Sequence, residues 1–196
     1  MSYLEYMLKN FVSSIVCIVA FIACAPKMSL ADREKAHSEH IEQLKEGALR
    51  IEINTAYPFQ TNAVNQVSNV IWQFTGNTAN RVIVSGSGDF IEIKNDTLHG
   101  DLSYIGERQI SSPYSSTDIG IRFNSVPREF EIIEDSHHKF IELVANISDR
   151  IENYDIRIRL YPTGNASAYI NSSLRTPIRY DGIIVKSNDS ESTEKS

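Results

Sequence analysis

Cysteine is scarce in this sequence: among 196 residues there are only two, Cys17 and Cys24, and both lie near the N-terminus. The chain after Cys24 therefore has no thiol to form a disulfide, to complete a cysteine-rich zinc site or to act as a nucleophile. Its fold must be stabilised by an apolar core, and the segment from residue 48 to residue 186 is long enough to bury one.

An excess of positive charge is also missing. The chain has 19 Lys and Arg residues against 25 Asp and Glu residues, which gives a formal net charge of −6. Proteins that bind nucleic acid usually carry a basic patch or stripe. The composition therefore argues against a nucleic-acid partner.

A hydrophobic run of membrane-spanning length is absent as well. The apolar stretch from Phe11 to Ala25 is shorter than the roughly 20 residues that a helix needs to cross a bilayer. A secretory signal peptide fits better, because its apolar centre is about 7–15 residues long and small residues precede the cut. The basic start of such a signal is Met7-Leu8-Lys9-Asn10 if translation begins at Met7 rather than Met1.

The end of this stretch, Phe21-Ile22-Ala23-Cys24, resembles a bacterial lipobox, in which a small residue precedes a cysteine that becomes acylated. We therefore expect residues 1–23 to be a signal peptide and Cys24 to carry lipid. Cys17 is a poorer candidate because Val16 precedes it. Two or more acyl chains on Cys24 would anchor the protein stably to a membrane.

The residues after Cys24 predict the location. In the lipoproteins that this chain resembles, an Asp directly after the cysteine often retains the protein at the inner membrane, and here Ala25 follows. Residues 25–29 also lack an acidic cluster of the kind that resembles a surface-export signal. We expect the protein at the outer membrane, facing the periplasm.

Residues 24–47 are predicted to hold the lipidated N-terminus and a short helix. Ser29 is suited to cap this helix and Gly47 to end it. Its apolar stripe is thin, which predicts a spacer helix that lies lightly on the domain or stands free. His37 and His40 follow Glu34 at helical spacing, but no fourth ligand is evident, so we expect no metal.

From residue 48 onward, apolar and polar residues alternate in short segments, and the clearest segment is Tyr154–Leu160. Turn signals such as Asn95-Asp96 separate these segments. The pattern predicts an all-β domain over residues 48–186, an antiparallel β-sandwich or an open barrel. Residues 60–79 predict a short helix and a loop, and the polar residues 187–196 predict a disordered tail.

No group of residues indicates catalysis. Gly86-Ser87-Gly88 precedes a strand pattern rather than the helix that a phosphate loop opens, so it predicts a hairpin turn. His137 and His138 fall in a predicted turn, and no serine stands in a nucleophile motif. We expect a protein that is not an enzyme and has no cofactor.

The segment Leu102–Arg108 leads into a serine-rich loop that carries Tyr114. One interpretation is a structural corner with a glycine turn and Tyr104 as a plug. The other is a binding rim, because exposed Tyr and Arg on a loop of a rigid scaffold suit recognition. On the second interpretation, Tyr104, Arg108, Tyr114 and Arg175 are the candidate binding residues.

Four stretches of the predicted domain carry a resemblance: Thr55–Pro58, Leu102–Arg108, Gly120–Phe123 with Val126-Pro127, and Arg175–Gly182. They resemble segments of a bacterial family of domains of unknown function, DUF4251, which is common in Bacteroidota and typically made as lipoproteins. Leu102–Arg108 is similar to the family's Leu-Pro-Tyr-Phe-Gly pattern, with Ser103 and Ile105 in place of Pro and Phe. The resemblance implies export, lipidation and a β-rich fold, and it implies no activity.

Two hypotheses on function follow. The first is a lipid-anchored envelope protein that acts as a binding or accessory module for a small ligand or an envelope protein. The alternative is a structural or assembly component of the outer membrane that pairs with a partner through a sheet edge and has no ligand pocket. A filled core with an exposed sheet favours the alternative, and a hollow apolar interior favours the first.

Overall fold

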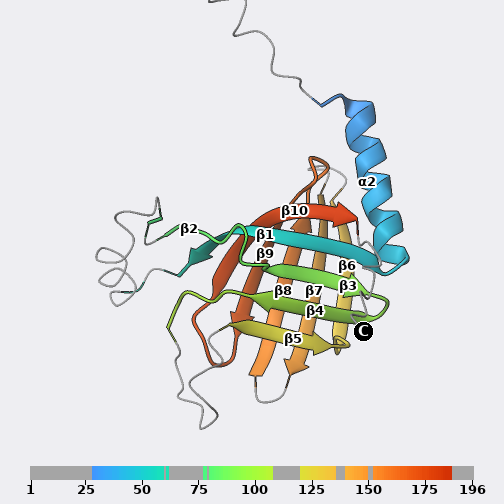
Figure 1. Ribbon diagram of the computed structural model, residues 1–196. Coiled ribbons are helices and arrows are strands. Elements are labelled where there is room, and N and C mark those ends of the chain that lie inside the picture. The colour runs from blue at the N-terminus through green and yellow to red at the C-terminus, as the bar shows by residue number, and fades with distance from the viewer. Residues whose placement is uncertain are drawn as a thin grey trace, which may run out of the picture. The chain divides into compact units, whose positions relative to one another are not determined.

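The computed structural model describes residues 28–59, 61, 77, 78, 80–107, 120–135, 140–149 and 152–186 (Figure 1). The predicted signal peptide with Cys24, the predicted helix within residues 60–79, and the predicted tail lie wholly or mostly outside these residues. Arg108 and Tyr114 also lie outside them.

The described residues form one helix and ten strands, in the positions where the sequence pattern predicts them to within a few residues. They are α2 (Leu30–Lys45), β1 (Ala48–Pro58), β2 (Val82–Ile83), β3 (Phe90–Lys94), β4 (Thr97–Leu102), β5 (Ile121–Ser125), β6 (Glu129–Asp135), β7 (Phe140–Asp149), β8 (Glu152–Leu160), β9 (Asn165–Ser172) and β10 (Ile178–Lys186).

The strands form a single antiparallel sheet in the order β5-β4-β3-β1-β10-β9-β8-β7-β6, and β2 pairs with the second half of β1. This sheet curls into a half-barrel (Figure 1). The all-β prediction is therefore confirmed, and of the two predicted architectures the open barrel is the one observed.

The concave face of the sheet surrounds a filled apolar core. Along β8 the side chains alternate strictly, so that Ile156, Ile158 and Leu160 are buried while Arg157 and Arg159 are exposed. Aromatic side chains, including those of Phe123 and Tyr180, occupy the interior with almost no exposed surface. The sheet therefore encloses packed side chains rather than a hollow interior. Of the two hypotheses, this favours the assembly role, and a ligand site has to lie outside the core.

A bulge in β1 changes which residues of this strand face the core. The pairing of β1 with β10 shifts between Ile53 and Thr55. Leu49 and Ile51 are buried before the shift, and Ala56 is buried after it, so the buried positions change from odd to even numbers. Tyr57 is thereby placed on the convex face.

Helix α2 contacts the domain through its C-terminal half. His40 and Leu44 are buried, and Ile41 packs against the core. On the same side of the helix, His37 lies 3.8 Å from the carboxylate of Glu134 on β6. Of the two arrangements predicted for this helix, the structure shows the one that lies on the domain.

The alternation along β8 can be tested with two substitutions. Ile158→Asp places a carboxylate in the apolar core, and an unpaired buried charge is expected to lower the free energy of unfolding by several kcal/mol. Arg159→Ala removes an exposed ion pair with Glu142, whose nitrogen–oxygen distance is 2.9 Å, and should cost no more than about 1 kcal/mol. Denaturant melts compare the two, and an equal loss for Arg159→Ala would contradict a solvent-facing outer surface.

Burial of His40 should make the docking of α2 depend on pH. Desolvation lowers the pKa of His40, while the charge of Glu39 acts in the opposite direction. The neutral His40 side chain contributes fully to the free energy of unfolding when the pH is above the unfolded pKa of about 6.5. This contribution is lost as the pH falls below that value. In thermal melts between pH 8 and pH 5, the melting temperature of the parent protein should fall more steeply toward acid pH than that of His40→Gln. Parallel curves would contradict this.

Candidate functional site

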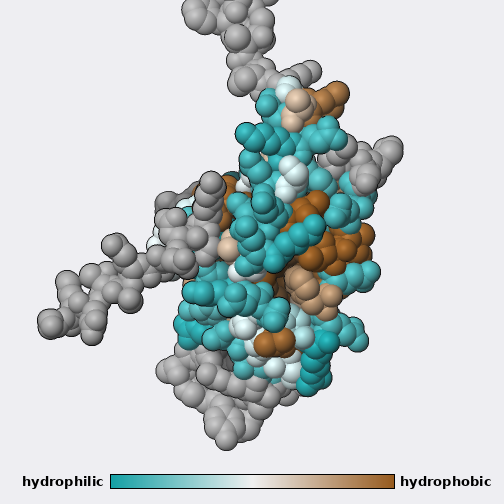
Figure 2. Space-filling model, turned by 90° about the vertical axis from the view of Figure 1, so that its right-hand side faces the viewer, coloured by the Kyte–Doolittle hydropathy of each residue, from teal (hydrophilic) through white to brown (hydrophobic). Residues whose placement is uncertain are grey.

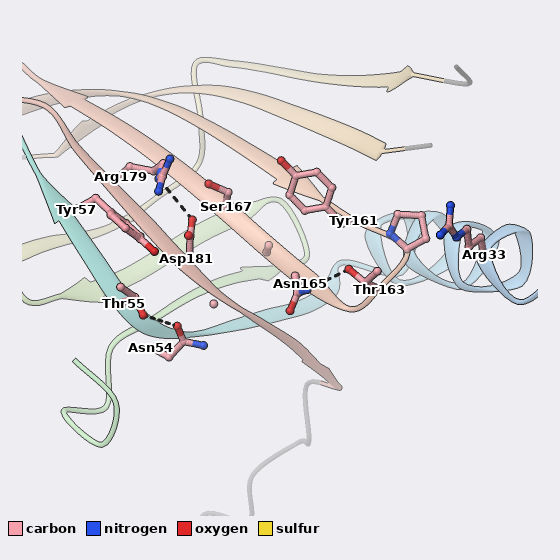
Figure 3. Close-up of a pocket in the computed structure, with 13 residues that line it drawn as sticks. Arg33, Asn54, Thr55, Tyr57, Tyr161, Thr163, Asn165, Ser167, Arg179 and Asp181 are labelled. Atoms are coloured by element: carbon pink, nitrogen blue, oxygen red, sulfur yellow. Dashed lines mark hydrogen bonds and ion pairs between the residues drawn. The ribbon is translucent and has the colours of Figure 1, made fainter. Parts of the chain in front are cut away.

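An open cavity of about 610 Å³ lies on the convex face of the sheet, between the middle strands and helix α2 (Figure 3). Its walls come from β1, β10, β9, the turn between β8 and β9, and one residue of α2. The side chains extend from Tyr57 and Arg179 at one end to Arg33 at the other (Figure 3). The cavity is therefore elongated and lies outside the packed core.

Cross-strand pairing assembles the floor of this cavity. Because of the bulge in β1, Tyr57 lies opposite Arg179 of β10, and Thr55 lies opposite Asp181. Asp181 in turn lies opposite Ser167 of β9. Directly opposed residues share a face of the sheet, so all five side chains belong to the convex face.

Arg179 is held in place from two directions. Its guanidinium carbon lies 4.0 Å from the centre of the Tyr57 ring, a cation–π contact. Its Nε lies 3.6 Å from a carboxylate oxygen of Asp181. The Arg179 side chain is still half-exposed and lines the cavity, so its guanidinium remains accessible.

The turn between β8 and β9 forms the second wall and is held by backbone hydrogen bonds. The amide of Tyr161 donates to the carbonyl of Asn165 at 2.9 Å, and the amide of Gly164 donates to the carbonyl of Tyr161 at 3.0 Å. The side-chain amide of Asn165 donates to the hydroxyl of Thr163 at 3.1 Å. The amide of Ile184 in β10 donates to the carbonyl of Gly164 at 2.8 Å, which ties the turn to the sheet.

The cavity requires a close approach of β1 and β10 at Gly182. A Cβ atom on this residue would collide with the backbone carbonyl of Glu52 on β1. Gly182 pairs with Ile53, directly before the bulge. The absence of a side chain here lets the sheet bend sharply beside the cavity.

The charged side chains that line the cavity carry a positive formal sum, and polar side chains surround them. Arg33 and Arg179 contribute two positive charges and Asp181 one negative charge, a formal sum of +1. Arg33 is exposed, and within the described part of the chain it makes no hydrogen bond or ion pair. Around these charges lie the side chains of Asn54, Thr163, Asn165 and Ser167, all of which can donate to or accept from a hydroxyl.

Two of the four candidate binding residues lie elsewhere, and both are buried. Tyr104 is 8% exposed and Arg175 is 3% exposed. They contact each other, with the guanidinium carbon of Arg175 5.1 Å from the centre of the Tyr104 ring. The two residues therefore lie together, but they are buried and do not form the exposed rim that the sequence predicted.

Hydrogen bonds explain why these two polar side chains can be buried. The Nε of Arg175 donates to Glu152 at 2.9 Å, and the hydroxyl of Ser172 contacts the same carboxylate. The Tyr104 hydroxyl lies 2.9 Å from the carbonyl oxygen of Glu107 and 2.8 Å from the hydroxyl oxygen of Thr176. Such pairing is what makes buried polar groups tolerable.

Burial also acts on the ionisation of the tyrosines in this network. Desolvation raises the pKa of Tyr104, and it raises the pKa of Tyr154 further, where the negative charge of Glu152 adds to the effect. Gly106 allows Tyr104 to fold back, because a Cβ there would meet the tyrosine hydroxyl at 2.5 Å. Over residues 102–107 the structure thus matches the structural-corner interpretation, with Tyr104 as its plug.

No local pattern in the sequence marks the cavity residues as a site. Tyr57, Thr55, Arg179 and Asp181 fall within the segments that carry the family resemblance. The pairing register of β1, β10 and β9, together with the one-residue bulge in β1, brings them together. An alternating pattern predicts strands but does not predict which strands are neighbours.

Comparisons with known proteins agree with this fold. The family model described as Domain of unknown function (DUF4251) matches residues 32–184. The crystal structure of a DUF4251 family protein from Bacteroides eggerthii superposes with a TM-score of 0.50 at 12% sequence identity, covering 77% of this chain and 87% of that one. No curated protein matches the chain significantly.

An identity of 12% shows a shared fold and carries no shared activity. The family match is stronger evidence, because it spans the helix and nearly the whole sheet. It covers the segments Thr55–Pro58, Leu102–Arg108 and Arg175–Gly182, from which the resemblance was recognised. The chain therefore belongs to the DUF4251 family.

Proposed function

We propose that this protein is a lipid-anchored envelope module that binds a small, hydroxyl-rich anionic ligand, such as a sugar acid, in the convex-face cavity. The observation that carries the proposal is a cavity of about 610 Å³ lined by two tyrosines, two arginines and several amide and hydroxyl side chains. Ligand pockets typically have volumes of about 300–1,000 Å³.

The chemistry of the lining residues supports this ligand class. Hydroxyl groups of a sugar need partners that both donate and accept hydrogen bonds, which Asn, Ser, Thr and Tyr side chains provide. Arg179 is already paired with Asp181, so Arg33 is the better partner for a carboxylate. A charge-assisted bond from a guanidinium to a carboxylate is stronger than a neutral hydrogen bond.

We propose binding rather than catalysis because of the side chains that line the cavity. Among the described residues that line the cavity, the single carboxylate, Asp181, is engaged by Arg179, and none is a histidine or a cysteine. A nucleophile and a base within hydrogen-bonding reach are what acid–base and covalent catalysis require. The proposed role is capture or presentation of the ligand at the membrane.

The envelope location rests on the sequence. The lipobox-like segment that ends at Cys24 supports a lipid anchor, and Ala25 after it supports placement at the outer membrane, facing the periplasm. Among the described residues, no helix is long and apolar enough to cross a membrane. The typical lipidation of the Bacteroidota family members that the chain resembles points the same way.

The ligand class can be tested with glucose and glucuronate, which differ by one carboxylate. Calorimetric titration should show tighter binding of glucuronate. Arg33→Gln should weaken glucuronate binding about tenfold, the loss expected for one charge-assisted bond, and leave glucose binding unchanged. Arg157→Gln is the matched control, because Arg157 is an exposed arginine of the convex face that does not line the cavity.

Two results would contradict this assignment. An equal loss of glucuronate affinity in Arg33→Gln and Arg157→Gln would show a general charge effect rather than a specific site. Absence of binding of both sugars at millimolar concentration would rule out the proposed ligand class.

The lipid anchor can be tested with the two cysteines. Cys24→Ala should release the protein from the membrane fraction, because no acyl chain is then attached. Cys17→Ala should leave it membrane-bound, which makes it the matched control. A Cys24→Ala protein that stays with the membrane would refute the anchor, and cleavage of the parent protein by protease on intact cells would refute the periplasmic orientation.

A further inference from the structure

Among the described residues, strand β6 is an edge of the sheet without a second partner strand, and it has apolar side chains at the surface. It pairs with β7 on one side and ends the sheet on the other. Phe130, Ile132 and Ile133 are 44%, 42% and 40% exposed, and Val126 just before the strand is 63% exposed. Figure 2 shows apolar residues gathered beside helix α2 on this side of the molecule. A free edge also presents unpaired backbone donors and acceptors.

The two faces of this edge differ in chemistry. Phe130 and Ile132 lie opposite the buried residues Ala145 and Leu143 of β7, so they belong to the concave face. Glu129, Glu131 and Asp135 alternate with them and therefore belong to the convex face. Glu134 also lies on the concave face, opposite Ile141, and Ile133 lies on the convex face, opposite Glu142. The concave face of the edge is therefore mainly apolar and the convex face mainly acidic.

A second copy of this chain does not fit the edge. Antiparallel self-pairing centred on Ile132 would place Glu129 opposite Asp135. Moving the centre by one residue would place Glu131 opposite its own copy, when the centre is Glu131, or opposite Asp135, when the centre is Ile133. Like charges directly opposite each other destabilise a strand pair.

We infer that β6 binds an extended segment of another protein in which Lys or Arg alternates with apolar residues. Such a segment would add a strand beside β6 through backbone hydrogen bonds. Its basic side chains would lie opposite Glu129, Glu131 and Asp135, and its apolar side chains would cover Phe130 and Ile132. The occupant is identified by charge complementarity with the acidic face.

A second cavity adjoins this edge and can hold a side chain of the partner. Its volume is about 400 Å³. Its apolar walls are formed by Val126, Pro127 and Phe130 next to β6, and by Leu44, Ile93 and Leu98 from the helix and the β3–β4 hairpin. An apolar residue at the end of the added strand would fill it. The β6 edge is therefore the place where the alternative function, assembly through a sheet edge, would act.

The test uses a short peptide of alternating Lys and Val. Two controls accompany it, a peptide of alternating Glu and Val and a peptide with the same Lys and Val content in two blocks. Fluorescence anisotropy should show binding of the alternating Lys-Val peptide and at least tenfold weaker binding of both controls. Hydrogen exchange should show new protection of the backbone amides of β6.

A charge-reversed variant tests the same surface from the protein side. Glu129→Lys with Glu131→Lys should weaken binding of the Lys-Val peptide about tenfold, since two favourable cross-strand pairs become repulsive. It should also gain binding of the Glu-Val peptide. Glu39→Lys with Glu42→Lys changes the net charge equally on the exposed face of α2 and should leave binding of the Lys-Val peptide unchanged.

Three outcomes would overturn the inference. Equal binding of the block peptide would show charge attraction without strand addition. Protection confined to β5, the other edge, would show that the partner binds there and not at β6. A concentration-dependent dimer that the β6 variant abolishes would make a second copy the occupant. None of the substituted residues lines the convex-face cavity, so these results are independent of sugar binding.

Discussion

The structure depends on one constraint: a single sheet must bend far enough to enclose its own apolar face. Without bending, residues such as Ile91, Ile141 and Ile158 could not share one core. Two features allow β1 and β10 to bend where they meet: the bulge after Ile53, and Gly182, whose missing side chain allows close approach. Both surfaces proposed to bind follow from this curvature, since the bulge exposes Tyr57 and incomplete closure leaves β6 as an edge.

Polar side chains inside the fold are arranged as pairs. Arg175 and Glu152 are both buried and bonded to each other, and Tyr104 stacks against the arginine. This arrangement joins the segment after β4 to the connection between β9 and β10, which are distant in sequence. Removing one partner would leave the other as an unpaired buried charge, which is far more costly than the pair. These residues are better explained as a specific structural clamp than as a ligand site.

The two proposed surfaces suit different partners because their chemistry differs. The convex-face cavity is polar, with a formal charge of +1 from its arginines and its aspartate. The β6 edge has the opposite sign and adds exposed apolar groups. A small anion and a basic extended chain would therefore not compete. A module that binds a ligand on one face and a protein at one edge is compatible with an accessory role at a membrane.

The sequence by itself determined the strands, because a residue alternation of period two has one simple physical explanation, a sheet with one buried face. Tyr154–Leu160 shows this most clearly, and the family resemblance came from short local segments. Closure was not determined: whether β5 and β6 meet depends on the curvature accumulated over the whole sheet. The burial of Tyr104 and Arg175 was also decided only in three dimensions, by a carboxylate on β8 and a hydroxyl next to Arg175. A residue's exposure depends on neighbours that are remote in sequence, and no local pattern encodes them.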